Sequence, residues 1–389
     1  MRILVLAGDA DGNLGDQAIR YATIAAVRSI LPSAEIALST RRPDRLTGSG
    51  LRLLRRGPFG LPGLLAAMAR ADLVLVGGGG LFQDDDSLVK MPYWSVLVLI
   101  SRLGGARTAG YAVGVGPLDA ASSRLAARLA FAMMERITVR DEIAAELVSG
   151  LTSKNVEILP DPALLLVPSA RDEARGLLRE AGVPLGTRPV IAVAARPWWP
   201  PARRLVPRML AARLGLPLRR DERGSARLVA GFAALLRGLA DARDAFVLFL
   251  PSYSARHEGD AAFAQEVARH IPEVPHAQLR LDDARQYAAV CREVDFLVAG
   301  RMHPAILATA VGTPAFGIGY NPKFAGFFRL IGHPERLVGS GALVEEGFDP
   351  KPIVARMLAA WEQGAPDREE IAALQRRILR QTRAILATA

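Results

Sequence analysis

Leu-Val-Leu-Val-Gly-Gly-Gly-Gly-Leu-Phe-Gln-Asp, residues 73–84, joins a short apolar run to four consecutive glycines. Four aliphatic residues in a row are typical of a strand that is buried on both faces, as in a parallel sheet. Glycine after such a strand lets the backbone turn sharply and approach a ligand closely. The stretch therefore predicts an α/β fold with a ligand-binding edge at the carboxyl ends of its strands.

Strand and helix patterns of this kind alternate along the 389 residues. We predict strands at residues 3–7, 35–39, 73–76, 107–113, 136–139 and 156–159, and then at 190–194, 245–250, 278–281, 296–298 and 315–318. Helical patterns separate them, as parallel sheets with crossover helices require. We expect two similar sheets facing each other across a cleft, in domains 1–168 and 186–340, followed by a helical tail over 341–389.

The composition is that of a globular protein, with 50% hydrophobic and 23% charged residues. The longest apolar runs, such as residues 94–100, are too short to cross a bilayer. The N-terminus turns polar at Gly8, which favours a buried first strand over a secretion signal, so a cytoplasmic location is expected. Cys291 is the only cysteine, which excludes an intramolecular disulfide and predicts a small buried side chain.

The formal charge of +10 comes almost entirely from arginine. Such an excess suits nucleic acid, anionic lipid headgroups or phosphorylated small molecules, although codon bias explains it equally well. Aromatic residues make up only 6%, without a stacking platform, so no nucleic-acid partner is expected. Residues 199–223 form a basic, proline-rich insertion; it and residues 51–65 fit either docking on anionic lipid or ordinary solvated helices with a buried leucine face.

Three turns of the first half are predicted to face the cleft: residues 8–16, the glycine turn 77–80 with the aspartates 84–86 that follow it, and residues 114–117. Asp84 is the preferred base that accepts a sugar hydroxyl proton. The carboxylates around it fit no metal-site spacing, so no metal is expected. Asp16 is equally compatible with a plain helix N-cap. The residues predicted on this acceptor side are Asn13, Asp16, Gly78, Gly79, Gln83 and Gly116.

The most informative stretch of the second half is Phe-Leu-Val-Ala-Gly-Arg-Met-His-Pro, residues 296–304. Pro304 suits a first helical position, which places Arg301 and His303 at a helix N-terminus. A guanidinium there grips phosphate or carboxylate, and an imidazole moves a proton near neutral pH. Arg196 ends the first strand of this half and Lys323 follows a later one, so both are expected at the same rim.

Taken in order, eight motifs resemble those of the polysaccharide pyruvyltransferase family over residues 1 to about 330. They are Gly-Asn-Leu-Gly-Asp (12–16), the glycine turn (77–84), Gly-Val-Gly-Pro (114–117), Val-Arg-Asp (139–141), Asp-Pro-Ala (161–163), Arg-Pro (196–197), Arg-Met-His (301–303) and Tyr-Asn-Pro-Lys (320–323). Residues 81–84 and 92–94 suggest the bacterial type that acts on a lipid-linked cell-wall saccharide. The insertion after Trp198 and the turn at 251–254 depart from the family pattern.

The resemblance implies two Rossmann-like domains facing across a cleft, arranged as in GT-B glycosyltransferases. It further implies phosphoenolpyruvate as donor, no other cofactor, and a ketal formed across two hydroxyls of one sugar. Arg196, Arg301 and His303 would hold the donor. We hypothesise that His303 protonates the methylene carbon, which makes it the expected catalytic residue together with Asp84.

Two other functions remain open from the sequence. A nucleotide-sugar-dependent GT-B glycosyltransferase would also place basic residues at the cleft of the second domain. A non-enzymatic protein that binds sugar phosphates or docks on a membrane would use the same cations without turnover. A peripheral contact with the anionic inner face of the cell membrane is compatible with each of these functions.

Overall fold

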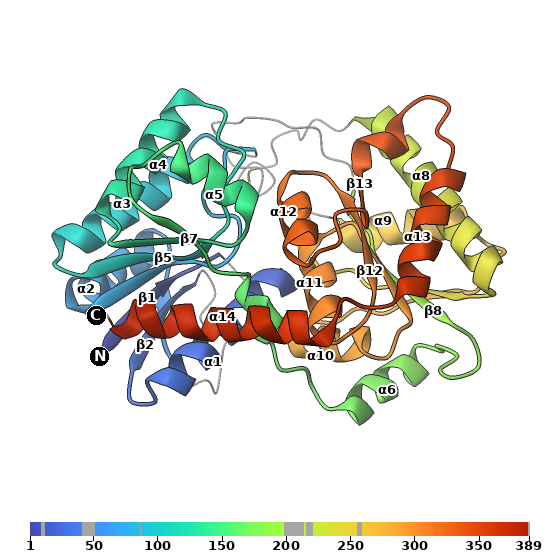
Figure 1. The fold of residues 1–389 in the computed structure, drawn as a ribbon, viewed down its shortest axis with the longest axis horizontal. Coiled ribbons are helices and arrows are strands. Elements are labelled where there is room, and N and C mark those ends of the chain that lie inside the picture. The colour runs from blue at the N-terminus through green and yellow to red at the C-terminus, as the bar shows by residue number, and fades with distance from the viewer. Residues whose placement is uncertain are drawn as a thin grey trace.

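The computed structural model describes residues 1–8, 12–40, 51–85, 87–197, 214, 221–254 and 259–387. It contains two parallel sheets, of seven and six strands, each flanked by helices (Figure 1). The fold is therefore α/β, as predicted. Each predicted Rossmann-like domain range contains one of the sheets, while the domain limits themselves stay predictions.

The first sheet has the strand order β3-β2-β1-β4-β5-β6-β7. Its strands are β1 (Arg2–Leu6), β2 (Glu35–Thr40), β3 (Arg52–Arg55), β4 (Leu73–Gly77), β5 (Arg107–Val113), β6 (Arg136–Val139) and β7 (Val156–Ile158). Its helices are α1 (Leu14–Ile30), α2 (Leu61–Arg70), α3 (Lys90–Leu103), α4 (Ala121–Met133) and α5 (Glu142–Ser149), with short 3-10 turns at Pro58–Gly60 (η2) and Pro162–Leu165 (η3).

The second sheet has the order β10-β9-β8-β11-β12-β13. Its strands are β8 (Val190–Ala194), β9 (Phe246–Phe249), β10 (His276–Gln278), β11 (Phe296–Ala299), β12 (Ala315–Gly319) and β13 (Leu337–Gly339). The helices of this half are α6 (Arg171–Glu180), α8 (Glu222–Arg243), α9 (Asp260–Arg269), α10 (Ala284–Cys291), α11 (Met302–Ala310), α12 (Lys323–Leu330), α13 (Lys351–Gln363) and α14 (Arg368–Ala387), with a 3-10 turn at Ser340–Val344 (η4).

Both sheets reverse their strand order at one point, between β1 and β4 in the first and between β8 and β11 in the second. In open parallel sheets, ligands bind beyond the carboxyl ends of the strands at this switch point. The turns that follow β1, β4, β8 and β11 are the glycine- and arginine-bearing turns of the sequence. The sheet topology and the sequence therefore indicate the same turns as the ligand-binding ones.

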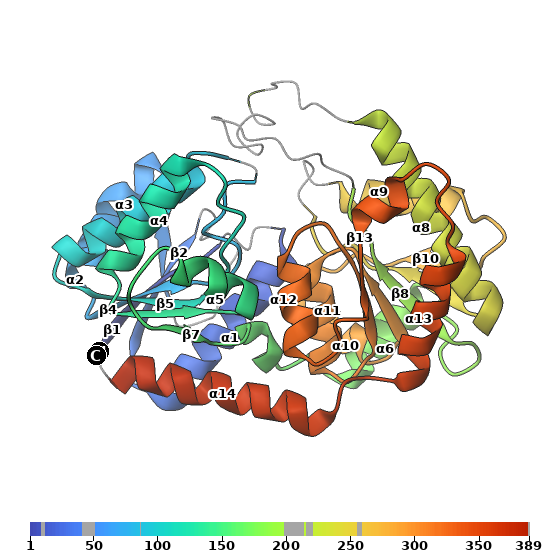
Figure 2. The same ribbon diagram turned by 45° about the horizontal axis from the view of Figure 1, so that its top comes forward.

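Helices cover each sheet on both faces (Figure 2). On one face of the first sheet, α2, α3 and α4 bury Met68, Trp94 and Phe131 against strand residues such as Val74. The opposite face belongs to a core that continues into the second half of the chain.

The C-terminal helix α14 leaves the second half and returns along the first (Figure 1). It buries Ile371, Ile378 and Ile385 in the shared core. The hydroxyls of Tyr111 and Thr382 are hydrogen-bonded at 2.8 Å, and burial raises the pKa of Tyr111 to about 12. The predicted helical tail thus fastens the two sheets together.

The structure differs from the sequence predictions at three strands and at residues 51–65. Strands β3 and β13 were not predicted, and β10 ends at Gln278, where the predicted strand 278–281 begins. Residues 51–65 are not one amphipathic helix, because they form β3, η2 and the start of α2. The basic insertion 199–223 lies outside the described residues except at 214 and 221–223.

Two further expectations concern burial and membrane segments. Cys291 is fully buried, as predicted. No helix in the described part of the chain combines the length and the apolar character needed to cross a bilayer.

Candidate functional site

The turn after β11 presents Arg301 and His303 at the start of α11. Arg301 is the N-cap residue and the helix begins at Met302, so Pro304 is its third residue rather than its first. The position of the pair at a helix N-terminus, where anions are favoured, nevertheless holds.

A buried carboxylate fixes the Arg301 guanidinium. Arg301 Nη2 donates to Asp260 Oδ1 at 2.6 Å, and Arg301 Nε donates to Asp260 Oδ2 at 2.7 Å. Asp260 is the first residue of α9 and is only 1% exposed. The guanidinium carbon also lies 5.1 Å from the centre of the Tyr253 ring. Two-point pairing with a buried partner gives the guanidinium one orientation.

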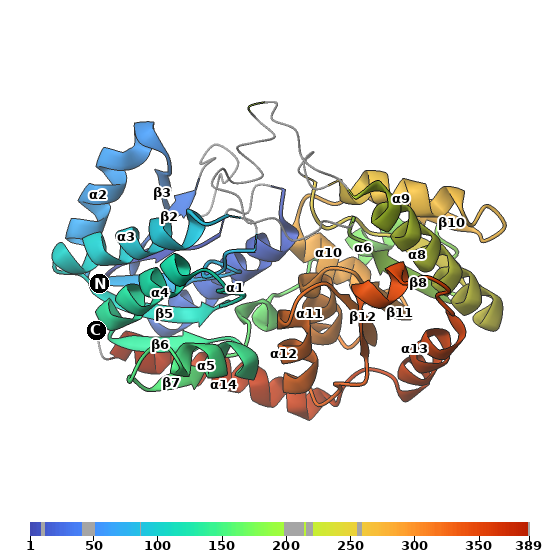
Figure 3. The same ribbon diagram turned by 90° about the horizontal axis from the view of Figure 1, so that it is seen from above.

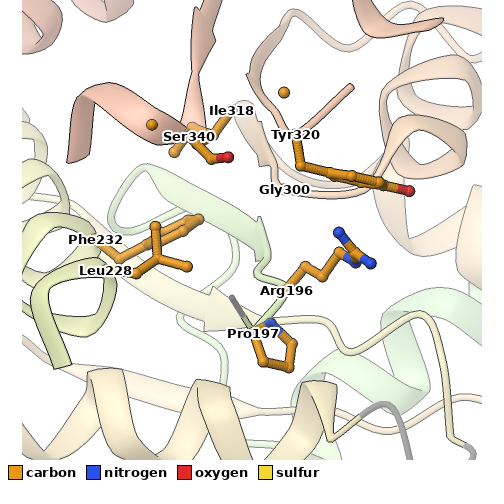
Figure 4. A pocket seen from close by; sticks show the side chains of 10 residues that line it. Arg196, Pro197, Leu228, Phe232, Gly300, Ile318, Tyr320 and Ser340 are labelled. Carbon is orange, nitrogen blue, oxygen red and sulfur yellow. The ribbon is translucent and has the colours of Figure 1, made fainter. Parts of the chain in front are cut away.

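Arg196, Tyr320 and Lys323 form a second cationic group on the same sheet edge. The guanidinium carbon of Arg196 lies 3.6 Å from the centre of the Tyr320 ring, and Lys323 Nζ lies 5.1 Å from it. Figure 4 shows Arg196 and Tyr320 together at a pocket of about 180 Å³, with Leu228 and Phe232 across from them. The predicted convergence of Arg196 and Lys323 at one rim is therefore seen in the structure.

The phenol of Tyr320 is perturbed by its cationic neighbours. Burial raises the pKa of this hydroxyl, but the positive charges of Lys323 and of two arginines outweigh burial and lower the pKa to about 8 from the ordinary 10.0. A group shifted in this way reports a strongly positive local field. Such a field favours an anionic ligand.

Asn321 adds an unusual amide to this group. Both its Nδ2 and its Oδ1 are buried and have no hydrogen-bond partner among the described residues. Leaving buried polar atoms unpaired is unfavourable, so a native structure usually satisfies them with a ligand or water. The amide therefore marks a polar subsite beside Tyr320.

His303 is held between its own helix and the first half of the chain. A Cβ built on Gly15 would lie 2.1 Å from His303 Nδ1, so the imidazole fits against α1 only because residue 15 is glycine. His303 Nε2 lies 3.7 Å from Asp161 Oδ2, beyond hydrogen-bonding distance, and has no hydrogen-bond partner among the described residues. Nε2 is thus buried and faces the carboxylate of Asp161.

Asp161 belongs to a small buried network behind His303. Burial raises the pKa of the Asp161 carboxyl. The nearby His303 and Arg140 lower this pKa by more than burial raises it, so the net pKa lies below the usual value. Arg140 Nη1 lies 3.8 Å from Asp161 Oδ2 and Arg140 Nε lies 3.4 Å from Asp141 Oδ2, so Arg140 forms ion pairs with both carboxylates. A permanent carboxylate therefore faces the imidazole.

The turn after β1 approaches the glycine turn after β4. Asn13 caps α1 by accepting hydrogen bonds from the N–H groups of Gly15 and Asp16, so Asp16 itself is not the N-cap. Gly79 has φ +93°, and a Cβ on it would lie 2.5 Å from Asp16 Oδ1. The Asp16 carboxylate thus sits directly on the glycine backbone, together with Asn13 Nδ2, which donates to its Oδ2 at 3.0 Å.

The remaining predicted acceptor-side residues lie along the same edge. Gly78 also has a positive φ, +85°. The Gln83 side chain folds over Gly80, where a Cβ would lie 2.3 Å from Oε1. Gly116 donates its N–H to the Phe82 carbonyl at 2.7 Å, which ties the third turn to the second. The three turns of the first half are therefore joined along one edge.

Asp84 does not face this edge as predicted. Its side chain is fully buried, Oδ1 accepts the N–H of Asp119 at 3.1 Å, and Oδ2 accepts the N–H of Ala120 at 2.8 Å. Both oxygens are thus used at the N-terminus of α4. The geometry favours a structural role for Asp84 over the predicted role of base, because a base must reach its substrate.

The two halves meet at these turns. Leu14 N–H donates to the Ser252 carbonyl at 3.1 Å, and Ser254 N–H donates to the Gly12 carbonyl at 2.7 Å. Figure 3 shows α1 and α11 from the two halves near each other at the centre of the molecule. His303, Gly15 and Asp16 consequently lie where the two switch points face each other.

Residues 13–322 match the family described as polysaccharide pyruvyl transferase. The chain belongs to the polysaccharide pyruvyl transferase family. It is therefore a transferase of polysaccharide pyruvylation, and the matched range contains every predicted site residue except Lys323. No curated protein sequence matches the chain.

Solved structures place this pyruvyl transferase among GT-B-like folds. UDP-GlcNAc 2-epimerase from Methanocaldococcus jannaschii has a TM-score of 0.61 at 9% identity, with 100% of both chains covered. ADP-heptose LPS heptosyltransferase II from E. coli has a TM-score of 0.51 at 13% identity, covering 93% of this chain and 99% of that one. At such identities the similarity extends to the fold alone.

Several site residues of this pyruvyl transferase were not predicted individually. Asp260 pairs with Arg301, Asp161 faces His303, and Gly15 makes room for the imidazole, although each is far from its partner in the sequence. Membership in a motif of the family resemblance was the one available signal, and it covered Gly15, Asp161, Tyr320 and Asn321 but not Asp260. Within the described residues, no cluster of three or more His, Cys, Asp or Glu side chains could hold a metal ion.

Proposed function

We propose that the protein transfers the pyruvyl group of phosphoenolpyruvate to two hydroxyls of one sugar in a polysaccharide precursor, forming a ketal and releasing phosphate. The observation that carries this proposal is the convergence of three cations around Tyr320 beside His303. Phosphoenolpyruvate bears a carboxylate and a phosphate, and it needs both charge neutralisation and a proton donor.

The donor would lie at the switch point of the second sheet. Arg301 is preorganised by Asp260, while Arg196 and Lys323 supply charge next to the Tyr320 ring. The buried amide of Asn321 can exchange hydrogen bonds with a donor oxygen. Together these groups would neutralise the carboxylate and the phosphate.

The chemistry would begin with proton transfer from the protonated imidazole of His303 to the methylene carbon, which becomes a methyl group. The first sugar hydroxyl then adds to C2 and loses its proton. Phosphate leaves with the C–O bonding pair, and the second hydroxyl adds to C2 and loses its proton, closing the ketal. The carboxylate of Asp161 would stabilise the protonated imidazole before the first step.

The acceptor would lie against the glycine turn of the first sheet. We assign the proton-accepting role to Asp16 in place of Asp84, because Asp16 is partly exposed beside Gly79 and next to the residue that contacts His303. A lipid-linked saccharide at the inner face of the cell membrane, with the enzyme in the cytoplasm, is the acceptor that this proposal favours.

The direct test is phosphate release from phosphoenolpyruvate. We expect release only when a saccharide acceptor is present, together with a ketal product in which the acceptor gains the pyruvyl mass. Sugar transfer from a uridine or guanosine diphosphate donor, without phosphate release from phosphoenolpyruvate, would instead establish a GT-B glycosyltransferase. Binding of sugar phosphates without either turnover would establish a non-enzymatic protein.

Tyr320 predicts a pH dependence of donor binding. Ionisation of the phenol above its pKa of about 8 places a negative charge between Arg196 and Lys323, and this charge repels an anionic donor. The Kd for phosphoenolpyruvate should therefore rise roughly tenfold between pH 7 and pH 9. Tyr320→Phe cannot ionise and should bind almost equally at both values; calorimetric titration measures both proteins. An equal rise in the variant would contradict the role of Tyr320.

A further inference from the structure

Exposed apolar side chains are concentrated on one face of the first sheet. Of the fourteen exposed large hydrophobic residues in the described chain, ten lie between residues 59 and 129. They belong to η2, α2, α3 and α4 or directly precede α3, and include Phe59 at 90%, Leu103 at 77% and Leu125 at 58% exposure. In residues 221–254 and 259–387, Leu379 is the only exposed large hydrophobic residue. Such a one-sided concentration is a mark of an interaction surface.

The three helices lie next to one another and present one surface, which we call the α2–α3–α4 face (Figures 1 and 3). Ser95 Oγ of α3 donates to the Ala126 carbonyl of α4 at 2.8 Å, and a Cβ on Gly104 would lie 3.2 Å from Ala69 of α2. Val89, Tyr93 and Val96 follow a helical spacing along α3. The exposed apolar residues therefore lie on neighbouring helices.

The charge of this face has one sign. Within their bounds, α2, α3 and α4 contain five basic residues and no acidic residue: Arg70, Lys90, Arg102, Arg124 and Arg128. Arg124 and Arg128 stand one position before the exposed Leu125 and Leu129. The nearby Glu135 offsets part of this charge, because it lies 3.5 Å from Arg102 and 2.6 Å from Arg107.

We propose that the α2–α3–α4 face docks on the surface of a bilayer that contains anionic lipid. Leucine, valine and aromatic side chains interleaved with cations suit the boundary between acyl chains and negatively charged headgroups. A second copy of the chain is a poorer occupant, because apposed faces would bring ten like charges together.

Docking in this way would also orient the cleft. Helices α3 and α4 begin after the glycine turn and after the turn at residues 114–117, so their N-termini lie at the carboxyl edge of the sheet. A bilayer against the face would hold the acceptor-side turns near the headgroups. This orientation rests on the proposed function, whereas binding to lipid does not.

The test uses the full-length protein with vesicles of phosphatidylcholine, with and without phosphatidylglycerol. We expect cosedimentation with the anionic vesicles, weakened by salt. Leu103→Glu combined with Leu125→Glu should lower the partition coefficient at least about tenfold, because both side chains would otherwise enter the interface. Leu379→Glu, at the exposed position of α14, should bind like the unchanged protein.

The possible outcomes test membrane docking separately from the proposed pyruvyl transfer. Equal vesicle binding by the double variant, or no binding by the unchanged protein, would overturn docking by this face. A dimer that the double variant abolishes, found by sedimentation velocity without lipid, would reassign the face to self-association. Phosphate release with a soluble saccharide should be the same in all variants, so its general absence would defeat the proposed function alone. Thermal melts confirm that the variants fold.

Discussion

Replacing His303 by glutamine is expected to lower turnover at least about 100-fold, because a positioned acid–base group commonly contributes that much or more. Glutamine keeps a polar side chain of similar length but cannot deliver a proton to carbon. Since the cations on Arg196, Arg301 and Lys323 remain, phosphoenolpyruvate should still bind. Steady-state phosphate release gives kcat, and calorimetry gives the Kd of the donor.

His270→Gln is the matched control, because His270 is an exposed histidine of the same half, at the end of α9. It should leave kcat and donor binding unchanged. Near-normal turnover in His303→Gln would remove His303 from the chemistry. A parallel loss of donor binding would instead make it a binding residue.

The central strands were predictable because they are buried on both faces. β4 and β8 read as uninterrupted apolar runs, as does β1 after Arg2, and the structure places each of the three within about one residue of the prediction. β3 reads Arg-Leu-Leu-Arg at one edge of its sheet and β13 has three residues at an edge, so neither carries that signal. Edge strands, half covered by solvent, depend on neighbours that the local sequence does not contain.

The site was predictable in its parts but not in its connections. Strand ends identified Arg196, Arg301 and Lys323, because parallel topology brings such ends to one edge. The burial of Asp84 was not predictable, since its partners are backbone N–H groups 35 and 36 residues away. The exposure of the α2–α3–α4 face was equally unpredictable from the sequence. Helix α3 is apolar almost all round, and only the packed sheet shows which of its sides stays exposed.

Gly15→Ala is expected to reduce turnover nearly as far as His303→Gln, although residue 15 carries no chemistry. The added Cβ would lie 2.1 Å from His303 Nδ1 and 2.4 Å from Cγ, so the imidazole must leave its position beside Asp161. Residue 15 cannot retreat easily, because its N–H is held by Asn13 and it belongs to the buried side of α1. A displaced general acid loses most of its contribution, about 100-fold or more, since proton transfer requires hydrogen-bonding reach.

Gly176→Ala provides the matched control, because Gly176 lies within α6 and a Cβ there meets nothing within 4 Å. It should retain full activity and gain up to about 1 kcal/mol of stability from its better helix propensity. Donor binding to Gly15→Ala, measured by calorimetry, should stay within a few-fold of the unchanged protein, since the donor cations lie on the second half. Turnover above half of normal in Gly15→Ala would show that the contact of His303 with the first half is not needed for catalysis. Loss of both donor binding and cooperative melting would show that the substitution disrupts the fold instead.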